Sequence, residues 1–171
     1  MPGFALSPVD SDLCSRLGQI VIKWTAIETL VSYAVGTFMF ADLAAMSVVS
    51  NSVSVSAQMK WIRALLSSHE HEQEHNQRVY ALISRAEDLR QERNELVHGT
   101  WNSEGCDPGT CLVETVNLDR SEIIRARLVT LHDLDDLSRD IDTWIDDYVA
   151  LGRELGFPRH RGGTKSIFAD D

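Results

Sequence analysis

Apolar residues recur at three- and four-residue intervals along three long stretches of the chain, a spacing that gathers them on one face of a helix. The stretches run from Ser11 to Phe40, from Gln73 to His98 and from Thr130 to about Leu155. Asp133 stands three residues after Thr130, where a capping box places an acidic side chain. The pattern therefore predicts three long amphipathic helices, the last of them with a defined start.

Two further elements follow from shorter patterns. Ser54 or Ser56 can cap a helix that runs to about Leu66. The segments Cys111–Leu118 and Ile123–Val129 are rich in β-branched residues and are separated by a polar turn, which predicts a β-hairpin. Gly99 follows the second long helix at the position of a C-terminal cap.

These elements predict a mainly α fold, a helical bundle with a small β-hairpin inserted between the second long helix and the C-terminal helix. Its 171 residues suit a domain of ordinary size. We expect residues 1–157 to form this helical domain. Residues 158–171 contain two adjacent glycines and few apolar side chains, so we expect a flexible C-terminal tail there.

Charge and cysteine content narrow the classes of function. Sixteen basic against twenty-six acidic residues give a net charge of −10, which argues against a protein that coats nucleic acids but leaves room for a local basic cleft. Three cysteines without an export signal predict reduced thiols. For Cys106 and Cys111, which share one loop, a disulfide or half of a metal site is the alternative.

The same features bear on location. The first ten residues carry no cluster of positive charge and no apolar core, so they do not predict a secretory signal. The most apolar stretch, Ile20–Met46, is interrupted by Lys23, Glu28 and Asp42, which is typical of a core helix rather than a membrane span. We therefore expect a cytoplasmic protein without a membrane partner.

Two charged residues fall within apolar stripes. Glu28 lies about 40° from Trp24 around the first long helix, and Arg93 is nearly in line with Leu89 and Val97 on the second. Because buried charges need partners, the pattern predicts a Glu28–Arg93 ion pair in the core. The alternative is that both side chains reach solvent at the edge of a stripe.

His98 lies about 140° from Arg93 around the same helix and shares a side with Asn94. The imidazole is therefore expected to point away from the core. A histidine in the last turn also complements the helix dipole, and this structural role is the alternative to a chemical one.

The run Arg93-Asn94-Glu95-Leu96-Val97-His98 resembles the signature of the HEPN superfamily, and the helical frame from about residue 12 to 155 is similar as well. The resemblance implies a homodimer in which two motifs face a shared cleft. It implies a ribonuclease of toxin–antitoxin or phage-defence type that needs no metal or other cofactor. The partners would be RNA and an antitoxin or other protein. Arg93 and His98 would be catalytic, Asn94 would assist, and Glu28 would support Arg93. Some members have lost catalysis, so a binding or regulatory module is the alternative.

The residue types suit this chemistry. Cleavage by the ribose 2′-OH needs a base, an acid and positive charge near the phosphorus. Histidine supplies either proton transfer near neutral pH, and arginine stabilises phosphate charge. One motif offers one histidine and a two-fold dimer offers two, which is a physical reason for a composite site.

Two more patterns each have a functional and a structural interpretation. His71-Glu72-Gln73-Glu74-His75 matches the H-E-x-x-H pattern of zinc proteases. Because its surroundings are polar, we interpret it as a solvated face, with adventitious metal binding as the alternative. Arg120, Arg125 and Arg127 belong to the hairpin and are the best candidates for RNA contacts, against the alternative of an ordinary solvated strand.

Overall fold

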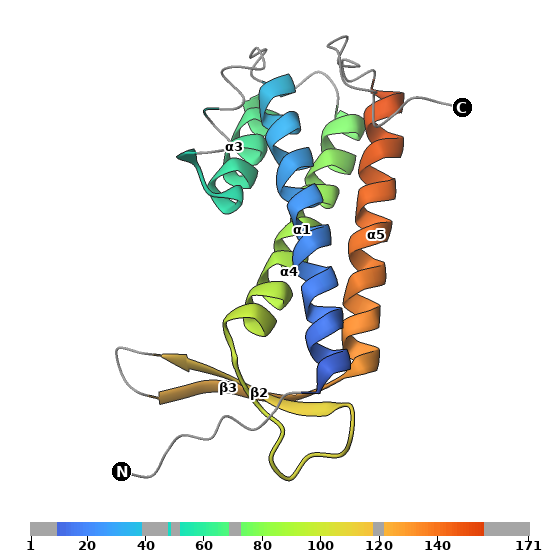
Figure 1. Ribbon diagram of the computed structural model, residues 1–171. Coiled ribbons are helices and arrows are strands. Elements are labelled where there is room, and N and C mark those ends of the chain that lie inside the picture. Colours follow the sequence, from blue (N-terminus) through green and yellow to red (C-terminus); the bar gives the residue numbers. More distant parts are fainter. Residues whose placement is uncertain (1–9, 39–47, 49–51, 69–72, 118–121, 156–171) are drawn as a thin grey trace, which may run out of the picture. The chain divides into compact units, whose positions relative to one another are not determined.

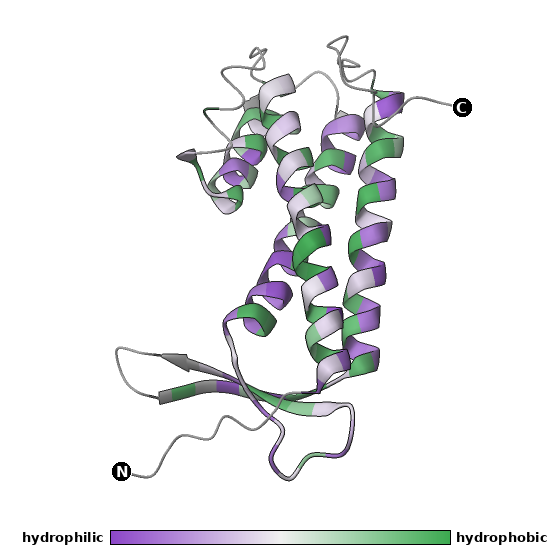
Figure 2. Cartoon of the chain, in the orientation of Figure 1, coloured by the Kyte–Doolittle hydropathy of each residue, from purple (hydrophilic) through white to green (hydrophobic). Residues whose placement is uncertain are grey.

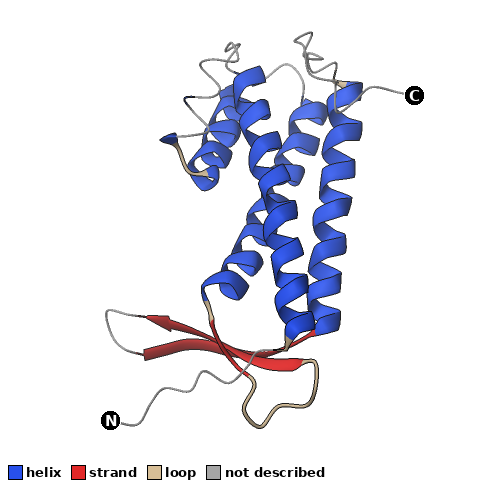
Figure 3. Ribbon diagram, viewed as in Figure 1, coloured by secondary structure: helices blue, strands red, loops and turns tan. Residues whose placement is uncertain are grey.

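The computed structural model describes residues 10–38, 48, 52–68, 73–117 and 122–155 (Figure 1). Its elements in chain order are α1 (Ser11–Phe38), α3 (Val55–Ser68), α4 (Gln73–His98), β1 (Thr100–Asn102), β2 (Thr110–Asn117), β3 (Glu122–Thr130) and α5 (Leu131–Glu154). Figure 3 shows the strands β1 to β3 inserted in a chain that is otherwise mainly helical. The predicted fold class, a mainly α fold with a small β insertion before the C-terminal helix, is confirmed.

The described chain forms two compact units. The first contains the residues up to Trp24 together with Asp88–Ile141, and the second contains Thr25–Glu87 and the residues from Asp142 onwards. The motif segment Arg93–His98 and the whole sheet belong to the first unit. Glu28 belongs to the second.

The first unit contains a three-stranded antiparallel sheet in the order β1-β2-β3. The predicted hairpin is the β2–β3 pair, and β1 is an addition that the sequence pattern did not predict. Trp101 of β1 lies opposite Val113 of β2, which lies opposite Arg127 of β3. Directly opposed residues share a face of an antiparallel sheet. Cys111, Val113 and Val129 are buried on this face, whereas Leu128 on the other face is 62% exposed.

One side of α5 is apolar. Figure 2 shows this as apolar residues along one side and polar residues along the other. The buried side chains are those that the periodicity predicts: Leu134, Leu137, Ile141, Trp144, Tyr148 and Leu151. Burial of side chains of this size contributes about 1.5–3 kcal/mol each.

The second unit is built around polar groups that find partners. The Trp144 indole donates to the carbonyl of Leu82 at 2.8 Å, and the Tyr148 hydroxyl donates to that of Leu30 at 2.8 Å. Ser32 donates to Gln58 at 2.8 Å, and both side chains are buried. These contacts connect the parts of α1, α3, α4 and α5 that make up this unit.

Two helix starts agree with the predicted caps. Ser54 rather than Ser56 precedes α3, and its hydroxyl accepts a hydrogen bond from the Ala57 amide at 3.3 Å. At α5, the Thr130 amide donates to Asp133 at 2.7 Å and the Asp133 amide donates back to the Thr130 hydroxyl at 3.2 Å. The predicted capping box is confirmed.

The flexible tail predicted for residues 158–171 lies outside the described residues. Among the described helices, none combines the length and apolar character needed to cross a membrane.

Candidate functional site

Arg93 is held on α4 between the buried side chains of Leu89 and Leu96. Its guanidinium is half-buried, and Nη1 donates a hydrogen bond to Asn94 Oδ1 at 3.0 Å. The Arg93 Nε is buried and has no hydrogen-bond partner in the described part of the chain. Asn94 therefore orients Nη1 of this guanidinium, while Nε makes no hydrogen bond to the described residues.

His98 is the last residue of α4 and is exposed, as the helical spacing predicted. Asn94 lies one turn earlier on the same side of the helix. Asn94 also accepts a hydrogen bond from Arg93, which connects these two motif residues. The end of α4 therefore presents an exposed imidazole one helical turn after an amide that orients the Arg93 guanidinium.

The end of α4 is anchored by groups outside the motif. The Trp101 indole of β1 donates to the carbonyl of Leu96 at 2.7 Å, and the Gly99 amide donates to the carbonyl of Glu95 at 3.0 Å. The second contact ends the helix without a left-handed residue, since the positive-φ glycines among the described residues are Gly105 and Gly109. A Cβ on Gly99 would lie 2.5 Å from Val113 Cγ1, so this glycine is required by the close approach of β2.

The prediction that Glu28 is buried in the core is wrong. Glu28 is exposed on α1, while its neighbours along the helix, Trp24, Ile27 and Val31, are buried. The physical reason is that Glu28 lies at the edge of the apolar stripe, from which a flexible carboxylate side chain reaches solvent. One of the two side chains expected to form a buried ion pair with each other is therefore not buried. The alternative, a side chain that reaches solvent at the edge of an apolar stripe, describes Glu28 correctly.

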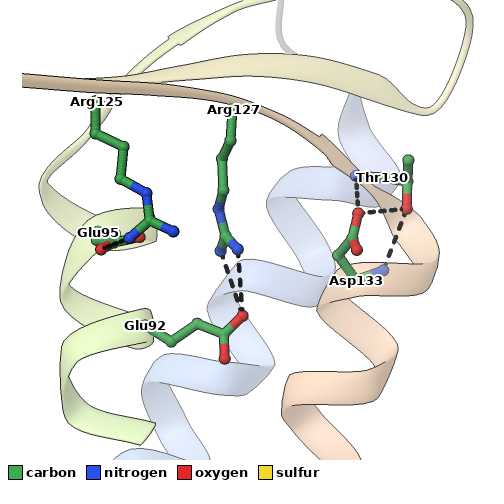
Figure 4. Close-up of polar contacts among 6 residues, drawn as sticks. All are labelled: Glu92, Glu95, Arg125, Arg127, Thr130 and Asp133. Atoms are coloured by element: carbon green, nitrogen blue, oxygen red, sulfur yellow. Dashed lines mark hydrogen bonds and ion pairs between the residues drawn. The ribbon is translucent and has the colours of Figure 1, made fainter. Parts of the chain in front are cut away.

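Two of the three candidate RNA-contacting arginines already form ion pairs with glutamates. Figure 4 shows Arg125 and Arg127 extending from β3 toward Glu95 and Glu92 of α4. Arg125 Nη1 donates a hydrogen bond to Glu95 Oε1. Arg127 Nη1 and Nη2 both lie 3.4 Å from the same oxygen, Glu92 Oε1. The third candidate, Arg120, lies outside the described residues.

Asp133 completes the charged row beside Arg127 in Figure 4. Hydrogen bonds from the Thr130 hydroxyl and amide lower the pKa of the Asp133 carboxyl, and the charge of Arg127 adds to the effect. Arg127 therefore lies near two carboxylates, of which Asp133 is committed to capping α5.

The three cysteines are free thiols, so Cys106 and Cys111 do not form a disulfide. Burial raises the pKa of the Cys111 thiol, which disfavours the thiolate that acts as nucleophile or metal ligand. His71 and Glu72 of the H-E-x-x-H pattern lie outside the described residues. Among the described side chains, no group of three His, Cys, Asp or Glu residues gathers closely enough to hold a metal ion.

Comparison with protein-family models, curated proteins and solved structures found no match to this chain. Reasoning from sequence had not identified Glu92 and Glu95 as partners of the β3 arginines, or Trp101 as an anchor of the motif helix. The three-residue spacing of the glutamates and the two-residue spacing of the arginines are visible in the sequence. Which glutamate pairs with which arginine depends on how β3 lies over α4.

Proposed function

We propose that this chain is a metal-independent endoribonuclease of HEPN type that acts as a homodimer with a composite site. The observation that carries the proposal is that the end of α4 presents His98 to solvent one turn after the hydrogen-bonded pair Arg93 and Asn94. This end of the helix combines an exposed imidazole with a half-buried guanidinium that Asn94 orients. These are the proton-transfer group and the phosphate-charge stabiliser that metal-free cleavage needs.

The proposed reaction is an attack of the ribose 2′-OH on the adjacent phosphorus. One His98 accepts the 2′-OH proton as the new P–O bond forms, and the His98 of the partner subunit protonates the departing 5′-oxygen as the P–O5′ bond breaks. Arg93 stabilises the negative charge on the non-bridging oxygens. The products are a 2′,3′-cyclic phosphate and a 5′-hydroxyl end. DNA lacks the nucleophile and is not a substrate.

Cleavage of labelled single-stranded RNA in excess chelator tests this proposal. We expect cutting to persist, because His98 and Arg93 supply the chemistry without a metal. His98→Ala should lower the rate by about 10²- to 10⁴-fold, the usual contribution of a proton-transfer group. His132→Ala is the matched control, because His132 is an exposed histidine of α5 in the same unit.

Three results would count against the enzyme. Intact RNA after prolonged incubation, loss of cutting on addition of chelator, or equal activity of the His98→Ala and wild-type proteins would each reject the mechanism. Chelator-sensitive cutting would instead indicate that a bound metal takes part, for which His71 and His75 are the candidate ligands. Analysis of product ends for the cyclic phosphate provides an independent check.

A non-catalytic binding or regulatory module is the second candidate. The observation that favours it is the pairing of Arg125 and Arg127 with Glu95 and Glu92, which reduces the positive charge available to RNA on a chain that already carries a net charge of −10. Binding of RNA or of a protein by wild-type chain without any cleavage would favour this candidate.

A further inference from the structure

Arg125 and Arg127 extend from β3 toward two glutamates of α4, Glu95 and Glu92 (Figure 4). The arginines are two residues apart on a strand, and their partners Glu95 and Glu92 are three residues apart on a helix. These spacings advance by about 6.6 Å along a strand and about 4.5 Å along a helix axis, so long side chains can bridge both steps. The two guanidinium groups form a short row on one side of the sheet.

The two ion pairs leave binding capacity unfilled. In the Arg127–Glu92 pair both nitrogens contact a single carboxylate oxygen at 3.4 Å, which is long for a hydrogen bond. The Arg125 side chain is 58% exposed despite its contact with Glu95. A guanidinium offers five donors, and here few of them are used.

A phosphodiester can replace either glutamate at these arginines. Carboxylate and phosphate both present oxygens that match the fork of a guanidinium. One side chain of each ion pair is well exposed, Arg125 at 58% and Glu92 at 40%, and such pairs contribute little net stabilisation and weaken in salt, so a phosphate can compete with the glutamate for the arginine. The carboxylates nevertheless compete with RNA, because each phosphate must displace one of them.

We propose that Arg125 and Arg127 form a binding site for successive phosphates of a single RNA strand, and that Glu92 and Glu95 screen this site and set its affinity. The inference deepens the proposed ribonuclease function and rests on it, because it assigns the substrate strand to the face of β3 beside the motif helix. Glu95 lies between Asn94 and His98 in sequence, so a strand bound at Arg125 passes close to the motif.

The test is RNA binding in a His98→Ala background, which prevents cleavage during the measurement. Fluorescence anisotropy with a labelled single-stranded oligouridylate gives Kd over a series of salt concentrations. We expect the additional substitutions Glu92→Gln and Glu95→Gln together to tighten binding by about tenfold. They should also steepen the slope of log K against log salt by about 1.4, since each phosphate contact on a single strand adds about 0.7.

Glu104→Gln with Asp107→Asn is the matched control, because it removes the same two negative charges from exposed positions of the β1–β2 loop. We expect it to change Kd by less than about twofold and to leave the slope unaltered. Replacing Arg125 and Arg127 by Gln in the Glu92→Gln/Glu95→Gln protein should remove the gain. If the double glutamine protein fails to fold, Glu95→Gln alone should steepen the slope by about 0.7.

Equal affinities of the double glutamine protein and its charge-matched control would overturn the proposal. A gain that survives loss of both arginines would overturn it as well. These outcomes are separate from failure of the proposed function, which is measured by cleavage with the wild-type chain. A wild type that cuts RNA while the glutamine variants bind unchanged would reject only the phosphate site, and a gain carried by the arginines without any cutting would reject only the enzyme.

Discussion

Gly99 joins α4 to β1 at a point where no side chain fits. An added Cβ would lie 2.5 Å from Val113 Cγ1 and 2.6 Å from the carbonyl oxygen of Glu95. The first neighbour is a side chain that could rotate, but the second is backbone of the motif helix. The position of His98 therefore depends on a glycine that immediately follows it.

We predict that Gly99→Ala destabilises the protein by about 1–3 kcal/mol through overpacking. Gly18→Ala is the matched control, because a Cβ at Gly18 on α1 meets no atom within 4 Å. It should be neutral or should stabilise the helix by about 0.5–1 kcal/mol. Urea unfolding of the two variants and the wild type measures the difference. A Gly99→Ala protein as stable as the wild type would show that β2 can move away from α4.

Arg93 and Glu28 occur in similar sequence patterns but have different surroundings. Arg93 is half-buried with one nitrogen shielded from solvent, whereas Glu28 is exposed. Both lie close to an apolar stripe in sequence. Their burial depends on which side of each helix the neighbouring elements cover, and this is not encoded in the helix itself.

At the scale of elements, α5 begins with a reciprocal cap. Thr130 and Asp133 exchange hydrogen bonds through their amides and side chains, and the hydroxyl contact is 2.6 Å. Because β3 ends at Thr130, the cap also defines where strand gives way to helix.

We predict that Asp133→Ala destabilises the protein by about 1 kcal/mol at neutral pH, the usual contribution of a cap. Since hydrogen bonds from Thr130 lower the pKa of Asp133 in the folded state from its ordinary value of 3.8, the contribution is full above that value. It is lost as the pH falls through the lower folded-state pKa. Denaturant unfolding at neutral pH and at about pH 2 should show the difference from wild type shrinking in acid.

Asp107→Ala provides the control for this pH series, because Asp107 is exposed in the β1–β2 loop and its carbonyl, not its carboxylate, accepts the hydrogen bond from Thr110. It should change stability little at either pH. A deficit of the Asp133→Ala protein that persists undiminished in acid would show that the carboxylate charge is not what stabilises the start of α5.

At the scale of the whole molecule, the proposed chemistry requires more than one chain. Each chain places one histidine at the end of its motif helix, and cleavage needs both a proton acceptor and a proton donor. A two-fold dimer supplies the second imidazole from an identical position.

We predict that the purified protein sediments as a dimer at micromolar concentration. Mixed dimers of wild-type and His98→Ala chains should be as inactive as the pure variant, because a composite site needs both imidazoles. Sedimentation velocity and cleavage by purified mixed dimers provide the two measurements. A strictly monomeric protein with full activity would exclude the composite site while leaving the fold unchanged.

The sequence by itself determined the three long helices, the cap at Thr130 and the exposure of His98. These properties follow from helical periodicity and from hydrogen bonds between residues only three or four positions apart, so local sequence is enough to encode them. The hairpin was predicted for the same reason, because β-branched segments flanked a polar turn.

Only the tertiary structure decided the exposure of Glu28, the strand β1 and the pairing of Arg125 and Arg127 with Glu95 and Glu92. β1 has three residues, too few for a periodic pattern, and it exists because β2 offers it a partner. The ion pairs join residues about thirty positions apart. Their formation depends on the register of β3 and on the side of α4 that it faces, and both are set by packing between elements rather than by any local pattern.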